Sequence, residues 1–453
     1  MFTSLREFKR QRQQFLRDAT NMKNKEFILF AIISIAFILI FFPPLFIVKA
    51  NRIWSTGIEL ATSTSNVEWD TTVGGLTVTT TQARSGNYDF LASTTVSQAQ
   101  FIRHQFQSDN IVDIFVRTYI YLNSPPSATT STKIISYCDS TLFCGANVAL
   151  NSNRTVSVKN QLNVVQSSST LTIPLATWTR LEMAYYDTQA TNTLAIYIDG
   201  TLATATSTTD IGGGGIVEIG AVSTSSMSAY FDDIAVNASS TGNNQNTIPG
   251  SGKIIHLRPN ATGDYDTGIK IGAATAWQAT NEVTPNGSTS YFMVTSTVNG
   301  GASVNLDPAA SGTIVTGDTI NLVQVGSYVN ASTSASDNFT LKLESQANGT
   351  TASSSPVTLA VTTWNPHDDT APKVYKITSY TNPQAGGGWT PALLDTAQIA
   401  FTSSTDAVPY PGVSTLWLLV DYTPTTTISG NTFTPRIILT GKSIFSGEMI
   451  LAP

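Results

Sequence analysis

The acidic residues of this sequence are poorly arranged for general acid–base catalysis. Retaining glycoside hydrolysis needs two carboxylates about 5–5.5 Å apart. Asp232 and Asp233 are adjacent in a strand-like segment, where successive side chains point to opposite faces. Glu182 is the sole acid of its own strand-like segment. The sequence therefore predicts a protein that is not an enzyme, neither a glycoside hydrolase nor a lyase.

The usual sequence patterns for nucleophilic catalysis, metal binding and phosphate binding are also absent. No G-x-S-x-G motif is present, so a serine-hydrolase elbow is not expected. His104, His256 and His367 are scattered, and no second Cys/His pair lies near the two cysteines to complete a zinc site. Gly212–Gly215 precedes no helical pattern, which indicates a strand connection rather than a phosphate loop.

The two cysteines, Cys138 and Cys144, lie six residues apart in the segment YCDSTLFCG. In an exported chain this spacing favours a local disulfide that closes a small loop. The alternative is a pair of reduced thiols.

A run of strand patterns from Thr177 to Val236 organises the first half of the chain. Arg180–Tyr186 and Leu194–Ile198 alternate apolar and polar residues, as strands buried on one face do. Asp199-Gly200 follows the second of these, and Asp-Gly between strands predicts a tight hairpin. Tyr230–Val236 would close the unit as one more strand.

The order of these motifs resembles the closing half of a concanavalin A-like, laminin-G-like jelly roll, over about residues 55–240. The matching residues are Trp178, Arg180, Leu181 and Glu182; Tyr197, Asp199 and Gly200; Gly220; and Phe231, Asp232 and Asp233. The resemblance implies an antiparallel β-sandwich. It also implies the glucanase strings E-x-D-x-E or E-x-D-x-x-E if the domain were a hydrolase, and neither string occurs.

Sugar binding is the ligand class that the resemblance implies. The segment Ile111–Leu122 predicts a long strand, whose Asp113, Phe115, Arg117, Tyr119 and Tyr121 would share the concave face where sugars can lie. Exposed aromatic rings suit the apolar faces of sugars. We expect Tyr119, Tyr121 and Tyr185 to contact a ligand, with Tyr186, Trp69 and Trp389 as further candidates and Trp178 in the core.

Calcium is the cofactor that the resemblance allows, because family members often hold it in rim loops through carboxylates and backbone oxygens. It would place Asp109, Asp232 and Asp233 at such a site. The alternative is that these carboxylates bind turn amides or an arginine such as Arg117 or Arg180.

Composition favours an exported β protein. Only 12% of the 453 residues are charged, and the net charge is −6. Residues 1–26 carry seven Lys/Arg against three acids, a net charge of +4, which leaves −10 for the remainder. An acidic body argues against nucleic-acid binding, which needs a basic face.

The segment Phe27–Val48 contains 22 residues without a charge, enough to cross a bilayer as a helix. The basic segment 1–26 before it predicts a cytoplasmic N-terminus and an outward-facing body. We therefore predict an uncleaved signal anchor over residues 27–49, in a single-pass protein of the cell membrane. The alternative is a signal peptide that is cleaved after Ala50.

The remaining chain predicts a second β domain. The segment 241–252 consists of turn formers and small polar residues, as linkers do. Strand patterns over residues 253–424 indicate a second β-sandwich, and 425–453 a tail with edge-strand patterns. The predicted fold class is all-β, with two tandem antiparallel β-sandwich (jelly-roll) domains after one N-terminal transmembrane helix.

These patterns together favour a membrane-anchored surface protein that binds glycans or mediates adhesion without catalysis. One alternative is a structural envelope or stalk component without a small ligand. The other is a carbohydrate-active enzyme.

Overall fold

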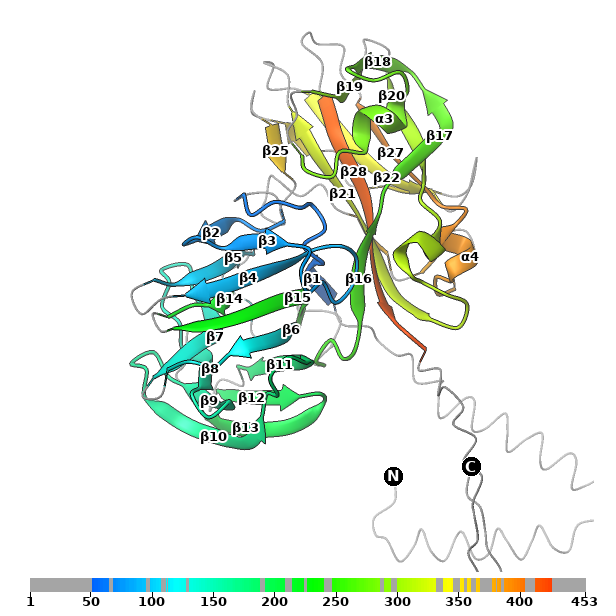
Figure 1. Cartoon of the computed structure of the whole chain (residues 1–453). Helices are drawn as coiled ribbons and strands as arrows, with labels where there is room; N and C mark the ends of the chain where they lie inside the picture. Colours follow the sequence, from blue (N-terminus) through cyan, green and yellow to red (C-terminus); the bar gives the residue numbers. More distant parts are fainter. Residues whose placement is uncertain are drawn as a thin grey trace, which may run out of the picture.

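The structure, a computed structural model, consists of two β-sandwiches in tandem (Figure 1). It describes residues 51–64, 68–94, 98–106, 111, 113–127, 130–187, 192–207, 214–223, 226–239, 247–285, 289–294, 300–330, 337–344, 351–353, 357–359, 364–366, 377–379, 381–383, 387–403 and 412–425. All pairs of named strands are antiparallel in both sandwiches, so the prediction of an all-β chain with antiparallel sheets is confirmed.

The first sandwich packs an eight-stranded sheet, which we call sheet I, against a seven-stranded sheet, sheet II. The order in sheet I is β13 (Thr201–Ser207), β12 (Thr193–Ile198), β11 (Trp178–Tyr186), β6 (Asp113–Ser124), β15 (Met227–Ser239), β4 (Asp89–Thr94) and β3 (Thr77–Thr79), with β1 (Asn51–Thr56) paired to β15. The order in sheet II is β10 (Val165–Thr172), β9 (Thr155–Lys159), β8 (Ala146–Asn151), β7 (Ser131–Cys138), β14 (Ile216–Ala221), β5 (Gln100–Gln105) and β2 (Thr71–Val73).

The second sandwich is built in the same way from sheets of seven and six strands. The first has the order β18 (Gly268–Ile271), β19 (Tyr291–Val294), β28 (Gly412–Thr423), β21 (Thr319–Asn330) and β25 (Trp364–Pro366), with β16 (Lys253–Leu257) on β28 and β26 (Ile377–Ser379) on β21. The second has the order β17 (Pro259–Asp266), β20 (Gly300–Leu306), β27 (Gln398–Ser403), β22 (Asp337–Glu344) and β23 (Thr351–Ser353), with β24 (Val357–Leu359) on β22. The short helices α3 (Ala276–Thr280), η1 (Ala309–Gly312) and α4 (Pro391–Leu394) lie in connections.

Strand β6 has the two faces that its alternation predicts. Ile114, Val116 and Ile120 point into the core between the sheets. Phe115 and Tyr119 lie on the other face of sheet I, outside that core. This outer face is the one on which the sequence predicts ligand contacts.

The hairpin at Asp199-Gly200 forms where the sequence predicts it. These two residues join β12 to β13 and have φ angles of 49° and 83°. A two-residue turn with positive φ at both positions matches the twist of the strands it connects, and Asp-Gly adopts it readily. Gly200 also leaves room for Arg180, whose Nη2 would lie 2.6 Å from an added Cβ.

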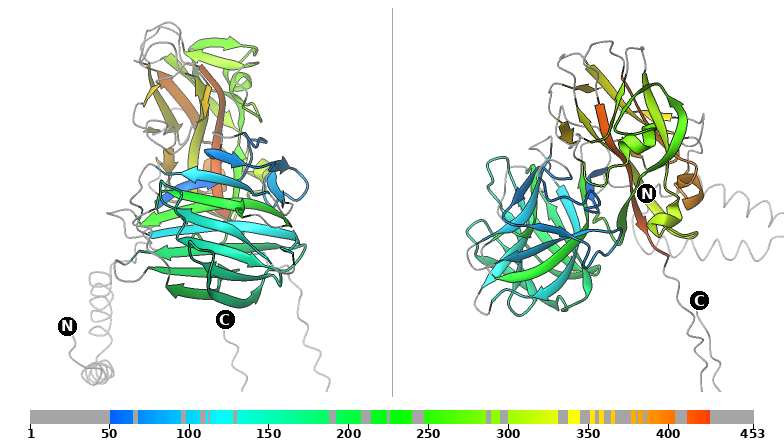
Figure 2. Two further views of the ribbon diagram at one scale, coloured as in Figure 1. Left: turned by 90° about the vertical axis from the view of Figure 1, so that its left-hand side faces the viewer. Right: turned by 45° about the horizontal axis from the view of Figure 1, so that its top comes forward.

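The two sandwiches meet along β1, β15, β16 and β28, so that the second lies against one side of the first (Figure 2). A small apolar cluster fills this junction, and its members come from both sandwiches: Leu60, Ala235, Ile254, Leu322, Trp417 and Leu419. The junction therefore has a hydrophobic core of its own.

The predicted membrane span over residues 27–49 lies outside the described residues and stays a prediction. Within the part of the chain that the structure describes, no helix has the length and hydropathy to cross a bilayer.

Candidate functional site

The outer face of sheet I carries an aromatic group at one end. Trp178 on β11 lies opposite Tyr121 on β6, and Tyr230 on β15 lies opposite Tyr121 on the other side. The ring centroids of Tyr121 and Trp178 are 5.6 Å apart, and those of Tyr121 and Tyr230 are 6.1 Å apart. Register between three neighbouring strands thus brings together residues that are far apart in the sequence.

A cleft of about 510 Å³ opens beside this group, between Trp178 and the connection from β3 to β4. We call it the aromatic cleft, and its lining is Thr80, Thr81, Gln82, Ala83, Gly86, Asn87, Tyr88 and Trp178. The Trp178 indole N–H donates to the Gln82 carbonyl at 3.0 Å, which fixes the ring against the loop. No lining residue carries a formal charge, so the cleft offers the rings of Trp178 and Tyr88, hydroxyl groups and amides.

The prediction that Trp178 lies in the core was wrong. A tryptophan that opens a strand was expected in the core, but its side chain is only half-buried and lines the aromatic cleft. The signal that could have found it is its register with Tyr121, since residues opposite each other on neighbouring strands share a face.

The middle of the outer face is covered by the segment Thr247–Gly252, which we call the strap. Ile248 packs with Phe115 and its apolar neighbours on β11 and β12. The Gly250 amide donates to Glu182 Oε1 at 2.8 Å. The strap is the second half of the segment predicted as a linker, and it is bonded to the sheet.

Tyr119 is buried by the strap and by one arginine. The Gly252 amide donates to the Tyr119 hydroxyl at 3.3 Å, and the Arg84 guanidinium stacks 3.2 Å from the centre of the Tyr119 ring. Arg84 also donates to the Gly252 carbonyl at 2.8 Å. The predicted ligand contact of Tyr119 is therefore replaced by contacts within the protein, whereas Tyr121 remains half-exposed at the edge of the strap.

Tyr185 lies on the opposite face from the one that a ligand contact requires. Its side chain is fully buried in the core of the first sandwich, 5.5 Å from the ring of Tyr137. Its hydroxyl accepts a hydrogen bond from Asn192 at 2.9 Å. The alternation of β11 explains the correction, because Tyr185 follows Leu181 and Met183 into the core, as odd-numbered residues of this strand do.

The two other tryptophans considered as platforms are also core residues. Trp69 belongs to the core of the first sandwich and Trp389 to that of the second. Tyr186 is half-buried beside the strap.

Asp232 and Asp233 form part of a β-bulge, and this overturns the prediction that they point to opposite faces. The register of β15 on β6 shifts between Asp232 and Ala235, and Asp233 has a φ of 52°. Asp232 Oδ2 accepts the backbone amides of Arg84 and Ser85 at 2.8 and 3.2 Å. Asp233 also binds both residues, through an ion pair with Arg84 and a hydrogen bond from the Ser85 hydroxyl. A bulge re-aims side chains in this way.

The bulge leaves the two aspartates satisfied by the protein. Both side chains are fully buried, and the pKa of Asp232 is raised well above its usual value, first by burial and then by the charge of Asp233. These bonds to turn amides and an arginine match the alternative to calcium binding, with Arg84 as the partner. Asp109, the third predicted calcium ligand, lies outside the described residues.

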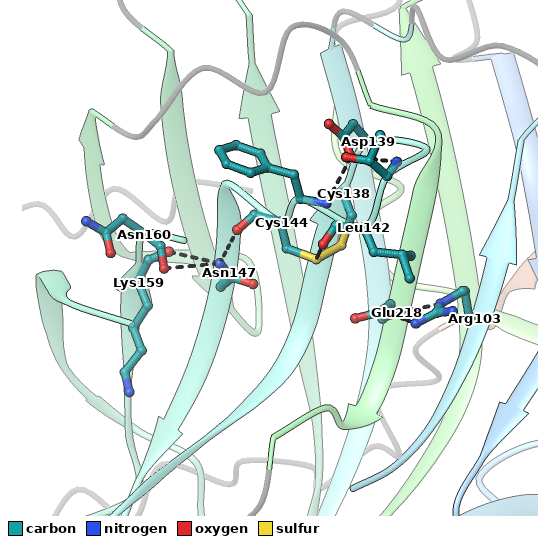
Figure 3. Close-up of a disulfide and its surroundings, with 11 residues drawn as sticks. Arg103, Cys138, Asp139, Leu142, Cys144, Asn147, Lys159, Asn160 and Glu218 are labelled. Carbon is teal, nitrogen blue, oxygen red and sulfur yellow. Dashed lines mark hydrogen bonds and ion pairs between the residues drawn. A yellow bond between two sulfur atoms is a disulfide. The ribbon is translucent and has the colours of Figure 1, made fainter. Parts of the chain in front are cut away.

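Cys138 and Cys144 form a disulfide at the end of β7 (Figure 3). Their sulfurs and the Glu218 carboxylate are the only grouping, among the described residues, with the spacing of a metal site. The sulfurs are joined to each other, and Glu218 Oε1 accepts from Arg103 at 2.6 Å. This grouping therefore offers no thiolate for a metal.

A second cleft, of about 320 Å³, lies at the junction of the sandwiches, with Glu59, His256 and Arg258 in its lining. Burial raises the pKa of Glu59 well above its usual value, even though the Asn87 amide donates to its Oε2 at 3.0 Å. Gly86, Asn87 and Tyr88 line this junction cleft and the aromatic cleft alike, so they form the wall between the two.

The fold defines an all-β protein of tandem antiparallel sandwiches with a cleft on the outer face of one sheet. No protein-family model matches the chain, and no curated protein matches its sequence.

Comparison with solved structures finds carbohydrate-related proteins. Cip1, a cellulose induced protein, matches with a TM-score of 0.31 and 16% identity, over 42% of this chain and 91% of its own. The carbohydrate recognition domain of Emp47p gives 0.29 and 10%, over 42% and 97%. The alginate lyase vAL-1 from Chlorella virus gives 0.33 and 9%, over 42% and 100%. Scores this low assign no function to this chain.

Proposed function

We propose that this chain is a membrane-anchored surface protein that binds uncharged glycans in the aromatic cleft without transforming them. The observation that carries the proposal is the half-buried Trp178 ring in a cleft whose other side chains include the Tyr88 ring, hydroxyls and amides but no charged group. Sugars present apolar C–H faces and a rim of hydroxyls, which such a lining matches. Cationic side chains that would attract uronic or sialic acids are absent from the described lining.

A glycan array of the full chain in detergent tests the binding part, with neutral and acidic glycans printed side by side. We expect binding to neutral glycans that Trp178→Ala weakens at least about tenfold, because loss of one stacking ring costs on the order of 1.4 kcal/mol. Trp277, a half-buried tryptophan of the second sandwich, gives the matched control Trp277→Ala. Arrays run with and without calcium show whether the ion contributes. A Trp178→Ala chain that binds as well as the native one contradicts the proposal.

The outward orientation is tested separately. Protease added to intact cells should digest residues 51–453 and leave the N-terminal segment protected. Digestion that requires cell lysis contradicts the proposed placement.

A second candidate is a structural envelope or stalk component. The specific observation that favours it is the strap, which covers the middle of the outer face of sheet I and is bonded to both sandwiches, to Glu182 of the first and to Thr423 of the second. An array on which the native chain binds no glycan at all supports this candidate over the first.

A carbohydrate-active enzyme is the third candidate, and the raised pKa of Glu59 in the junction cleft favours it. A carboxyl whose pKa is raised by burial holds its proton more tightly, as a general acid must before it donates it. Release of sugar products from polysaccharides by the native chain, abolished in Glu59→Gln, would establish this reading. Absence of product in both chains removes it.

A further inference from the structure

Two neighbouring hairpins of sheet II expose apolar side chains at one end of the first sandwich. The connection from β7 to β8 exposes Leu142 and Phe143, at 45% and 38%. The connection from β9 to β10 exposes Leu162, Val164 and Val165, at 72%, 53% and 49%. These are five of the ten large apolar side chains that are exposed among the described residues. We call the segments 139–143 and 160–165 the apolar tips.

The two apolar tips have the same internal bonding. Asp139 Oδ1 accepts the amides of Thr141 and Phe143 at 2.8 and 2.9 Å. Asn160 Oδ1 accepts the amides of Leu162 and Val164, both at 3.0 Å.

Backbone bonds complete each tip. The Leu142 amide donates to the Asp139 carbonyl at 3.1 Å, and the Asn163 amide donates to the Asn160 carbonyl at 3.0 Å. These six backbone donors therefore need no water.

The apolar tips are held in place relative to each other. The Asn147 side-chain amide donates to the Cys144 carbonyl at 2.8 Å and to the carbonyls of Lys159 and Asn160 (Figure 3). The disulfide between Cys138 and Cys144 closes the first tip at its base. The apolar side chains are thus presented on a braced support.

The apolar tips lie at the end of the sandwich where the described chain begins. Cys138, next to the first tip, pairs with Ile216 on β14, and the neighbouring Gly214 bridges to Ile111. Ile111 leads into β6, whose Ile114 pairs with Ala238. Ala238 pairs in turn with Asn51 at the start of β1.

The predicted membrane span ends at residue 49. An extended chain covers about 3.5 Å per residue, so Asn51 lies within about 10 Å of the end of that span. The end of the sandwich that carries Asn51 and the apolar tips therefore faces the bilayer surface.

The scarcity of charged side chains in the apolar tips favours contact with lipid through apolar burial. Asp139 is the one charged side chain of the tips, and its carboxylate is turned back onto its own loop. At the same end, Asp113 accepts the Asp187 amide at 3.0 Å, and Arg103, which lies beside the first tip, is paired with Glu218 (Figure 3). Segments whose amides are satisfied internally enter hydrocarbon at low cost, whereas unsatisfied amides do not.

We propose that the two apolar tips contact the outer leaflet of the membrane in which the chain is anchored, burying Leu142, Phe143, Leu162, Val164 and Val165 in the lipid interface. This contact would fix the tilt of the first sandwich on the membrane and leave the aromatic cleft, whose Trp178 lies opposite Tyr121 at the other end of β6, directed outward. The inference rests on the proposed N-terminal membrane anchor.

The test uses the full chain reconstituted in phosphatidylcholine vesicles, with a bimane probe on a cysteine introduced as Leu162→Cys. The matched control is Leu202→Cys, a leucine exposed at 54% beside the Asp199-Gly200 turn at the other end of the sandwich. Labelling is carried out without reductant to keep the native disulfide. We expect doxyl-phosphatidylcholine to quench the probe at residue 162 at least about twofold and the probe at residue 202 hardly at all.

A third labelled chain carries Leu162→Cys together with Phe143→Asp, both at exposed positions that do not support the fold. An added charge opposes entry into lipid, so quenching at residue 162 should fall toward the level at residue 202. Vesicle flotation tests the membrane anchor separately from the contact of the tips with lipid. If the chain floats with the vesicles but the probe at residue 162 is not quenched, the lipid contact is overturned and the anchor is not. Energy transfer between labelled copies would then show that the tips contact a second copy of the chain. A chain that does not float overturns the anchor and the tip contact together.

Discussion

The Asp421 carboxylate of the second sandwich lies 3.1 Å from the Arg117 guanidinium of the first, and neither side chain is exposed to solvent. The same carboxylate oxygen pairs with Arg52 at 2.5 Å, and its other oxygen accepts from Asn321 at 2.9 Å. Burial acts to raise the pKa of Asp421, but the charges of Arg117 and Arg52 outweigh it and hold the pKa below its usual value. The acid is therefore ionised, and one carboxylate of the second sandwich pairs with two arginines of the first.

The first prediction concerns this junction. Arg117→Ala should lower the free energy of unfolding by about 3 kcal/mol, because it leaves a buried ion pair without one partner. Urea unfolding followed by fluorescence measures the change. Replacement of all three buried charges by apolar side chains, in the triple variant Arg52→Met, Arg117→Met and Asp421→Leu, should recover most of the loss.

Arg103→Ala is the control for that prediction. Arg103 pairs with the buried Glu218 at 2.6 Å, but the Arg103 side chain is 22% exposed, so water screens this pair and its loss should cost less than the loss of Arg117. An Arg117→Ala chain that is no less stable than the Arg103→Ala chain would show that the junction does not depend on the buried pair.

The second prediction concerns the strap. A Cβ at Gly252 would lie 2.3 Å from Arg117 Nη1 and 2.7 Å from Asp421 Oδ1, so Gly252→Ala must displace the buried ion pair. We expect a loss of about 2 kcal/mol, comparable to other overpacked buried sites. Gly387→Ala is the matched substitution, because an added Cβ there meets no atom within 4 Å. Equal stability of the two variants in urea unfolding would contradict the tight packing of the strap.

The sequence predicted the parts of this fold that depend on local chemistry. Alternation placed Ile114 and Val116 in the core, and Asp199-Gly200 marked its hairpin, because side-chain period and turn conformation are local properties. The aromatic cleft was not predicted, because Trp178, Tyr121 and Tyr230 share a face only once three strands have a register. Register is a long-range property that one strand does not reveal.

The packing of the strap at the junction of the two sandwiches was not predicted, for a related reason. Composition marked 241–252 as a linker, since small polar residues also form flexible connections. In the structure Gly252 of the strap is required by close approach to Arg117 and Asp421, and Gly250 has a φ of 74°, which favours glycine. The bulge at Asp233 was equally hidden, because strict alternation predicts opposite faces and the extra residue breaks it.

The third prediction concerns the disulfide below the apolar tips. Cys138→Ser with Cys144→Ser should lower the free energy of unfolding by about 2 kcal/mol, the chain-entropy estimate for so short a loop. Urea unfolding of the native chain with reductant should give the same value, and reductant should not affect the variant. A native chain that is indifferent to reductant would show that the bridge contributes nothing to stability.

The last prediction concerns the pH dependence that Asp89 confers. Asp89 lies on β4 without solvent exposure, and burial raises its pKa from 3.8 to about 7, with nearby backbone amides offsetting part of the effect. Because the folded state holds the proton up to about pH 7 and the unfolded state releases it near pH 4, the contribution of Asp89 to stability falls between these values.

An asparagine in place of this acid would keep the shape of the protonated carboxyl and remove its titration. Asp89→Asn should therefore leave stability nearly unchanged at pH 4 and raise it relative to the native chain at pH 8. One pKa unit corresponds to about 1.4 kcal/mol, so the rise from 3.8 to about 7 limits the gain to about 4 kcal/mol, and we expect at least about 2 kcal/mol.

Asp139→Asn is the control, because the pKa of Asp139 is lowered whereas that of Asp89 is raised. Burial acts to raise the pKa of Asp139, but the hydrogen bonds from Phe143 and Thr141 together outweigh burial and lower it. A carboxyl with a lowered pKa is ionised in both states above pH 5, so the effect of Asp139→Asn on unfolding should be equal at pH 5 and pH 8. If Asp89→Asn also gives equal changes at those two values, Asp89 is ionised in the folded chain throughout, and its burial does not shift the proton.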